Sequence, residues 1–219
     1  KMTDQIQRII STIYLVAAIV SVTLFPVSAS GETLRFVFLA DSRANSSPDA
    51  LGHPVNTEAL KPIIEKIGQL DPLPAFVIFG GDMSYRGYIR DEHQHIETGY
   101  TFQQWKDLFN DLTAKGIDGI DLYTAIGNHE LYRHDDKLPS DAGFFLDNQE
   151  EFKKVIAENP SNGPPGYKHL VYSFTSPGGD AFFAVLDPYY LTQNTKPDGL
   201  GGHIDDVQLE WLKAQVSKT

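Results

Sequence analysis

Apolar positions in this chain form two kinds of pattern, continuous runs and runs at helical spacing. Continuous apolar runs rich in β-forming residues occupy 34–40, 75–81 and 122–128, and they predict strands that are covered on both faces. Between them, apolar residues recur every three or four positions in 56–70 and 101–116, which predicts two amphipathic helices. This alternation predicts an α/β fold in which right-handed crossovers make the three strands parallel.

The second half of the chain predicts a helix, a hairpin and a last helix. Residues 141–158 have helical character, and 170–187 contain two β-rich runs joined by "SPGGD", a turn sequence typical of a hairpin. Residues 205–216 predict a helix with Asp205 as its N-cap. No internal repeat or low-complexity tract interrupts the pattern.

The first thirty residues follow a different pattern. Lys1 and Arg8 precede an apolar stretch at 9–25, and small residues follow up to Ala29, as in a secretory signal peptide cleaved after that alanine. The alternative is an uncleaved membrane anchor, for which the stretch is slightly short. We therefore expect residues 1–29 to be a signal peptide, and 30–219 to be one secreted or periplasmic domain without stable membrane association after cleavage.

Composition narrows the classes of function. With 219 residues and 41% hydrophobic content, the chain is long enough to bury a core. The formal net charge is −11 and there is no basic block, so we expect no nucleic-acid partner. The chain has no cysteine, which excludes disulfides and thiolate metal sites. Any metal would depend on Asp, Asn, His and Tyr side chains, which favour hard or borderline ions.

Polar residues follow each predicted strand directly. Asp41 follows the first strand, Asp82 the second, and Asn128 with His129 the third. Because parallel strands place their C-terminal ends at one edge of a sheet, we expect these side chains to converge there. Converging carboxylates repel one another unless a cation lies among them. Asp187 follows the last strand and precedes a proline, and there a turn-forming role is the simpler interpretation.

The motifs around these residues resemble those of the calcineurin-like metallophosphoesterase superfamily. The matching segments are "GGD" at 80–82, "GNHE" at 127–130, the hairpin ending in "VLD", and "QLEWLKAQV" at 208–216. The resemblance implies an αββα sandwich, two divalent or trivalent metal ions (Fe, Zn or Mn), and hydrolysis of phosphate esters. The expected substrate is a phosphorylated small molecule or protein. Specificity would depend on the loops 42–56, 86–101 and 131–145.

The same resemblance implies a role for each matched residue. Asp41 would bind the first metal, Asp82 would bridge both metals, and Asn128 would bind the second. His129 would lie beside the scissile bond and act as the general acid. Glu130 or another acid would orient its ring.

Two further residues come from subfamily patterns. Tyr85 stands in a "GD-x-x-Y" segment similar to that of the purple acid phosphatases, in which the tyrosine binds iron, and packing alone is the alternative. Arg86 stands where Ser/Thr phosphatases carry an arginine that contacts the substrate phosphate, and a solvated loop arginine is the alternative.

Arg43 is a departure from the family pattern. Many members have D-x-H at the first motif, whereas this chain has "DSR". Because a guanidinium stays protonated, Arg43 cannot ligate a metal; it would bind phosphate or displace the first metal electrostatically.

The remaining histidines are a second departure. The family's later histidine motifs have no counterpart before Thr219, and none of the other six histidines stands in a matching motif: His53, His93, His95, His134, His169 and His203. We therefore expect a domain truncated at its C-terminus that binds metal weakly. A catalytically degenerate member that binds phosphate or a partner is the main alternative to a phosphoesterase, and an α/β binding domain without metal is another.

Overall fold

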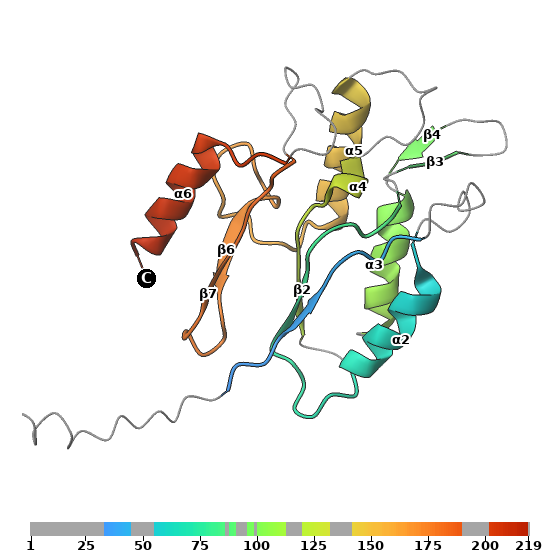
Figure 1. Ribbon diagram of the computed structural model, residues 1–219, viewed down its shortest axis with the longest axis horizontal. Coiled ribbons are helices and arrows are strands. Elements are labelled where there is room, and N and C mark those ends of the chain that lie inside the picture. The colour runs from blue at the N-terminus through green and yellow to red at the C-terminus, as the bar shows by residue number, and fades with distance from the viewer. Residues whose placement is uncertain are drawn as a thin grey trace, which may run out of the picture. The chain divides into compact units, whose positions relative to one another are not determined.

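A three-stranded parallel sheet lies at the centre of the computed structural model. The model describes residues 33–44, 55–85, 88–90, 96–98, 100–112, 120–131, 142–189 and 202–218. Strands β1 (Val37–Leu39), β2 (Phe76–Phe79) and β5 (Asp121–Thr124) pair in the order β1-β2-β5, all parallel (Figure 1). The predicted α/β fold with a parallel sheet is therefore confirmed. The candidate signal peptide lies outside the described residues.

The predicted helices are present and supply most of the core. Helix α2 (Thr57–Ile67) packs on α3 (Tyr100–Leu112), and α3 packs on α5 (Ala142–Val155). Their apolar stripes meet the sheet in a buried cluster that includes Leu60, Ile64, Phe79, Met83, Phe102, Trp105, Phe109, Ile126 and Phe152. Phe79 packs edge-on against Trp105, with ring centroids 4.8 Å apart, so the middle strand is fixed to α3.

The buried stripe of α2 is narrower than its spacing predicts. Ile64 and Ile67 are buried, whereas Ile63 is 44% exposed and Leu70 is 40% exposed and lies beyond the helix end. Pro62 lies inside the helix, beyond the first turn in which a proline is ordinarily tolerated. Pro62 and Glu58 are both exposed, so the carbonyl that loses its N–H partner lies on the solvent side.

Strand β1 is not covered on both faces, contrary to the prediction. Phe38 is 63% exposed and Phe36 is 43% exposed, because β1 is an edge strand in the described sheet. Phe36 stacks on Phe76, with ring centroids 5.3 Å apart, and thereby joins an aromatic layer. Phe174 and Phe183 of the hairpin pack edge-on against the same Phe76 ring, at 5.2 and 5.1 Å.

The predicted hairpin and the last helix are confirmed. β6 (Tyr172–Thr175) and β7 (Phe182–Val185) pair antiparallel, and Asp205 caps α6 (Asp206–Val216) by accepting the Gln208 N–H at 3.0 Å. The sequence did not predict the short hairpin of β3 (Tyr88–Arg90) and β4 (Ile96–Thr98), nor the one-turn helix α4 (Asn128–Leu131). In the described part of the chain, every helix lacks the length and apolar character needed to cross a bilayer.

Candidate active site

The ends of the three parallel strands lie together, as the sequence predicts. The Asp41 amide donates a hydrogen bond to the Gly81 carbonyl at 3.0 Å, directly beside Asp82. The Asp82 Oδ1 atom in turn accepts the backbone N–H of His129 at 3.1 Å. Asp82 therefore connects the loop after β2 to the loop after β5.

Both candidate carboxylates stand on left-handed backbone. Asp41 has φ of 61° and Asp82 has φ of 58°, and among the described residues His169 is the only other non-glycine residue with positive φ. This conformation is uncommon for residues with a Cβ and is often found at functional sites. Gly81, the residue before Asp82, also has a positive φ of 93°. These two successive left-handed residues turn the chain after strand β2.

The two loops approach so closely that a glycine is required between them. A Cβ added at Gly127 would lie 2.2 Å from Asp82 Oδ1 and 2.5 Å from its backbone nitrogen. A Cβ at Gly81 would meet the Gly127 nitrogen at 2.5 Å. The glycines of "GGD" and "GNHE" thus allow the backbone contact that brings Asp82 beside Asn128 and His129.

Glu130 holds this contact together. Its fully buried carboxylate accepts backbone N–H groups from Gly127 at 2.7 Å, Asp82 at 3.0 Å and Met83 at 2.6 Å. Burial, followed by the charge of Asp82, raises the pKa of Glu130 to about 7 against the opposing effect of these three donors. The suggestion that Glu130 orients the His129 ring is wrong, because both carboxylate oxygens bind backbone amides. Nothing in the sequence distinguishes a glutamate that binds backbone amides in this way from any other glutamate.

Arg43 and Tyr85 orient His129 instead. The Arg43 Nη1 atom lies 2.8 Å from His129 Nε2, and Arg43 Nε donates to Asp41 Oδ1 at 2.6 Å. Because a guanidinium only donates, His129 Nε2 must accept, and Nδ1 then donates to the Tyr85 carbonyl at 3.0 Å. The pKa of Arg43 rises above its ordinary value, chiefly because of the hydrogen bond to Asp41, although partial burial opposes the rise.

The other candidate residues have different placements. Tyr85 is buried, and its ring centroid lies 5.9 Å from that of His129. Asn128 is half-buried at the start of α4. Arg86 lies outside the described residues, as do His53, His93, His95 and His134. His169 donates from Nδ1 to the Asn159 carbonyl at 2.7 Å, and His203 is exposed.

Asp187 acts as a turn former, as its sequence context indicates. Its Oδ1 accepts the N–H of Tyr189 at 2.7 Å, and Gln208 pairs with its backbone N–H and carbonyl. Tyr189 lies close enough to the site that Asp82 and Glu130 contribute, after burial, to raising its pKa. Sequence reasoning missed this tyrosine, because nothing in "DPYY" distinguishes it from a loop residue.

Oxygen donors dominate the strand-end site. Asp41, Asp82 and Asn128 supply carboxylate and amide oxygens, the ligands that hard divalent ions prefer. Among the described residues, no group of three or more histidine, aspartate and glutamate side chains could hold a metal ion by itself. The donor set around Asp82 fits a weakly held oxygen-liganded ion, whereas the Asp41 carboxylate is already paired with Arg43.

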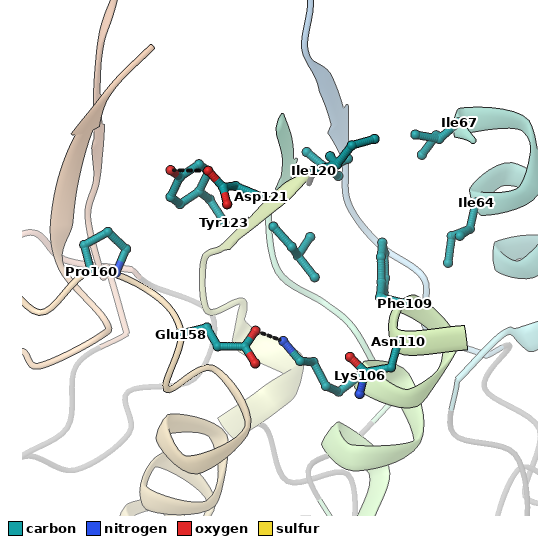
Figure 2. A pocket seen from close by; sticks show the side chains of 12 residues that line it. Ile64, Ile67, Lys106, Phe109, Asn110, Ile120, Asp121, Tyr123, Glu158 and Pro160 are labelled. Carbon is teal, nitrogen blue, oxygen red and sulfur yellow. Dashed lines mark hydrogen bonds and ion pairs between the residues drawn. The ribbon is translucent and has the colours of Figure 1, made fainter. Parts of the chain in front are cut away.

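A separate cavity of about 420 Å³ lies near the start of β5 rather than its end. Apolar side chains from α2, α3 and the sheet form much of its lining, and the Lys106–Glu158 ion pair and the Tyr123–Asp121 hydrogen bond lie at it (Figure 2). Asp41, Asp82 and His129 do not line it, so this cavity and the strand-end site are different places.

Comparison with known proteins identifies one family. The family model described as calcineurin-like phosphoesterase matches residues 34–217, which includes every described strand and helix. No curated protein matches the chain.

Proposed function

We propose, because the chain belongs to the calcineurin-like phosphoesterases, that the strand-end site hydrolyses phosphate esters with the help of bound metal. Members of this family are in general metal-dependent hydrolases that act on phosphorylated substrates. The observation that carries the proposal is the position of Asp82 between the other two strand ends. The carbonyl of its neighbour Gly81 accepts the Asp41 N–H, and the Asp82 carboxylate accepts the backbone N–H of His129. A central carboxylate joining the two other loops is the arrangement that a metal-bridged site requires.

The proposed ligands are the oxygen-bearing side chains at the three strand ends. In the two-ion form that the resemblance implies, Asp41 and Tyr85 would hold the first ion, Asn128 would hold the second, and Asp82 would be shared by both. Bound metal would supply positive charge for the phosphate oxygens and activate the attacking water. The chain's own contribution is to position these groups, which phosphoryl transfer demands more than covalent chemistry.

His129 is the proposed general acid, and Arg43 and Arg86 are the proposed phosphate-binding residues. His129 Nε2 accepts a hydrogen bond from Arg43 in the resting site, so it presents no proton to a substrate there. We expect a phosphate group to draw the Arg43 guanidinium away, because bidentate binding to phosphate oxygens is favourable. Nε2 would then take up a proton from solvent and donate it to the leaving oxygen.

The experiment is hydrolysis of p-nitrophenyl phosphate and bis(p-nitrophenyl) phosphate by the protein loaded with manganese, zinc or iron. We expect metal-stimulated turnover that falls at least about a hundredfold in Asp82→Asn and in His129→Ala. Asp180→Asn, in the exposed turn between β6 and β7, is the matched control and should retain full activity. Absence of turnover on monoesters, diesters and nucleotides with every metal would reject the proposal.

A catalytically degenerate member is the second candidate function. The contacts of Arg43 with both Asp41 and His129 favour it, since they engage two residues that an active site would use. Calorimetry with inorganic phosphate separates the two: phosphate binding that is lost in Arg43→Gln, without turnover by the parent protein, supports the degenerate reading.

We also propose that the protein is exported from the cytoplasm. The apolar stretch at 9–25 and the small residues before Ser30 support export to the periplasm or the outside of the cell. N-terminal sequencing of the protein from its native host tests this. A mature chain beginning at Ser30 supports cleavage, whereas a membrane-bound chain retaining residues 1–29 indicates an anchor.

A further inference from the structure

We infer that the Arg43 guanidinium takes the place of one of the two cations, so that this site holds a single metal ion, on Asp82 and Asn128. The inference rests on the proposed function, because it concerns the charge balance of the same site. It differs from the two-ion form because the Asp41 carboxylate pairs with Arg43 and does not bind a metal ion.

The first support is the pair of contacts that Arg43 makes. Its Nε donates to Asp41 Oδ1 at 2.6 Å while its Nη1 contacts His129 Nε2 at 2.8 Å. One rigid guanidinium therefore spans a carboxylate and an imidazole from different strand ends. A metal ion at Asp41 would have to compete with this guanidinium for the carboxylate.

The second support is that the backbone around Arg43 is fixed. Ser42 donates from its buried hydroxyl to the Met83 carbonyl at 2.9 Å, and its own carbonyl accepts the Asn56 N–H at 2.8 Å. Arg43 forms an antiparallel bridge with Val55, whose side chain belongs to the hydrophobic core. The arginine thus starts from an anchored position beside Asp41, unlike a side chain on an untethered loop.

The third support is electrostatic. Arg43 stays protonated at every accessible pH, so it is a permanent positive charge beside Asp41 and Asp82. A divalent ion bound within a few ångströms of it would be repelled strongly, because the interaction energy grows with both charges and with closeness. An ion on Asp82 and Asn128 meets a weaker form of this repulsion, because the direct hydrogen bonds of the guanidinium go to Asp41 and His129.

Substitution of Arg43 by histidine is the decisive change, since it restores the D-x-H pattern in place of the cation. We would titrate Mn²⁺ into the protein, measure stoichiometry by calorimetry, and record the electron paramagnetic resonance spectrum. We expect one Mn²⁺ per chain and an isolated-ion spectrum for the parent protein. For Arg43→His we expect two Mn²⁺ per chain and the spectrum of an exchange-coupled pair.

Two further variants test the effect of the charge and the specificity of the site. Arg43→Gln removes the charge and brings only a neutral amide in its place, so the single Mn²⁺ should bind about tenfold more tightly. Arg35→His is the matched control, because Arg35 is exposed and hydrogen-bonds the Asp71 carbonyl, at the beginning of the sheet rather than its end. It should leave both stoichiometry and affinity unchanged.

The inference is overturned if the parent protein binds two Mn²⁺ ions with a coupled spectrum, or if it binds none. It is also overturned if Arg43→Gln leaves the affinity unchanged. Hydrolysis of p-nitrophenyl phosphate on the same samples separates the two hypotheses. One bound ion without turnover refutes the proposed function and supports the inference, whereas two bound ions with turnover do the reverse.

Discussion

The Glu130 carboxylate accepts the backbone N–H of Asp82 at 3.0 Å, although the two residues lie 48 positions apart in the chain. The same carboxylate binds Met83 from the loop after β2 and Gly127 from the loop after β5. Glu130 therefore joins the two loops that carry the candidate metal ligands, and it does so inside the protein, where water cannot replace the lost bonds. Its role is to position Asp82 rather than to contact a substrate.

Glu130→Gln should destabilise the protein and weaken metal binding together. The amide has one acceptor oxygen, and its NH₂ group would face a backbone N–H, so at least one buried donor loses its partner. We expect the free energy of unfolding to fall by about 2–3 kcal/mol at pH 8, where the carboxylate is charged. Urea denaturation measures it, and the exposed Glu158→Gln should change stability by less than about 0.5 kcal/mol. A loss that small for Glu130→Gln as well would contradict the role assigned here.

Gly127→Ala should remove Asp82 from its position. The added methyl group would stand 2.2 Å from Asp82 Oδ1 and 2.9 Å from Glu130 Oε2, and neither group can retreat without breaking a hydrogen bond between the two loops. We expect a loss of about 3 kcal/mol or more in stability and no detectable Mn²⁺ binding. In Gly178→Ala, the nearest atom is the end of the Asp180 side chain at 3.1 Å, so this control should be close to the parent protein in both measurements.

Asn159 takes the place of a neighbouring strand at the β5 edge of the sheet. Its side-chain amide donates to the Thr124 carbonyl at 3.0 Å, and its Oδ1 accepts the Thr124 N–H at 3.1 Å. Asn162 pairs in the same way with Ser173 in β6, but Asn162 is exposed. The two residues make the same pair of strand-like hydrogen bonds, although the Asn159 amide also donates to the Thr124 hydroxyl and to the His169 carbonyl.

Aspartate at these two positions should therefore have unequal effects. Asn159→Asp places a buried carboxylate oxygen against a carbonyl and should cost about 3 kcal/mol or more. Asn162→Asp makes the same exchange where water can solvate the charge and should cost less than about 1.5 kcal/mol. Thermal and urea unfolding at pH 7 would measure both, and equal losses would show that burial does not decide the cost.

Asp187 should make the protein less stable as the pH rises. Burial raises its pKa from 3.8 to about 7, against the opposing N–H of Tyr189, and its Oδ2 has no hydrogen-bond partner among the described residues. The folded state therefore holds the proton more tightly than the unfolded state. The resulting stability is fully present below pH 3.8 and is lost as the pH rises to about 7.

Asp187→Asn should remove that pH dependence, because asparagine resembles the protonated acid. The difference in free energy of unfolding between Asp187→Asn and the parent protein should grow in favour of the variant by up to about 1.4 kcal/mol per pH unit between pH 4 and 7. Urea denaturation at unit steps from pH 4 to 8 measures it, with the exposed Asp180→Asn as control. Stability curves that run parallel at every pH would rule out Asp187 as the source.

Much of the fold was predictable because it depends on short-range patterns. The apolar run at 75–81 predicts β2, and the three-to-four-residue spacing of Phe102, Trp105 and Phe109 predicts the buried face of α3. The exposure of Phe38 was not predictable from its run, since the pattern reports apolar character and not which strand stands at the sheet's edge.

The sequence alone determined the order of the longer helices and of the strands of the sheet and the last hairpin, the parallel sheet, the edge at which Asp41, Asp82 and Asn128 gather, and the family. Only the tertiary structure decided what the polar side chains at that edge bind: Arg43 spans Asp41 and His129, and Glu130 binds the backbone of two loops. The physical reason is one of range. Which face of a helix or strand is buried follows from the spacing of apolar residues a few positions apart. Which partner a polar side chain binds depends on segments far away in the sequence, because only the folded chain brings them within hydrogen-bond distance.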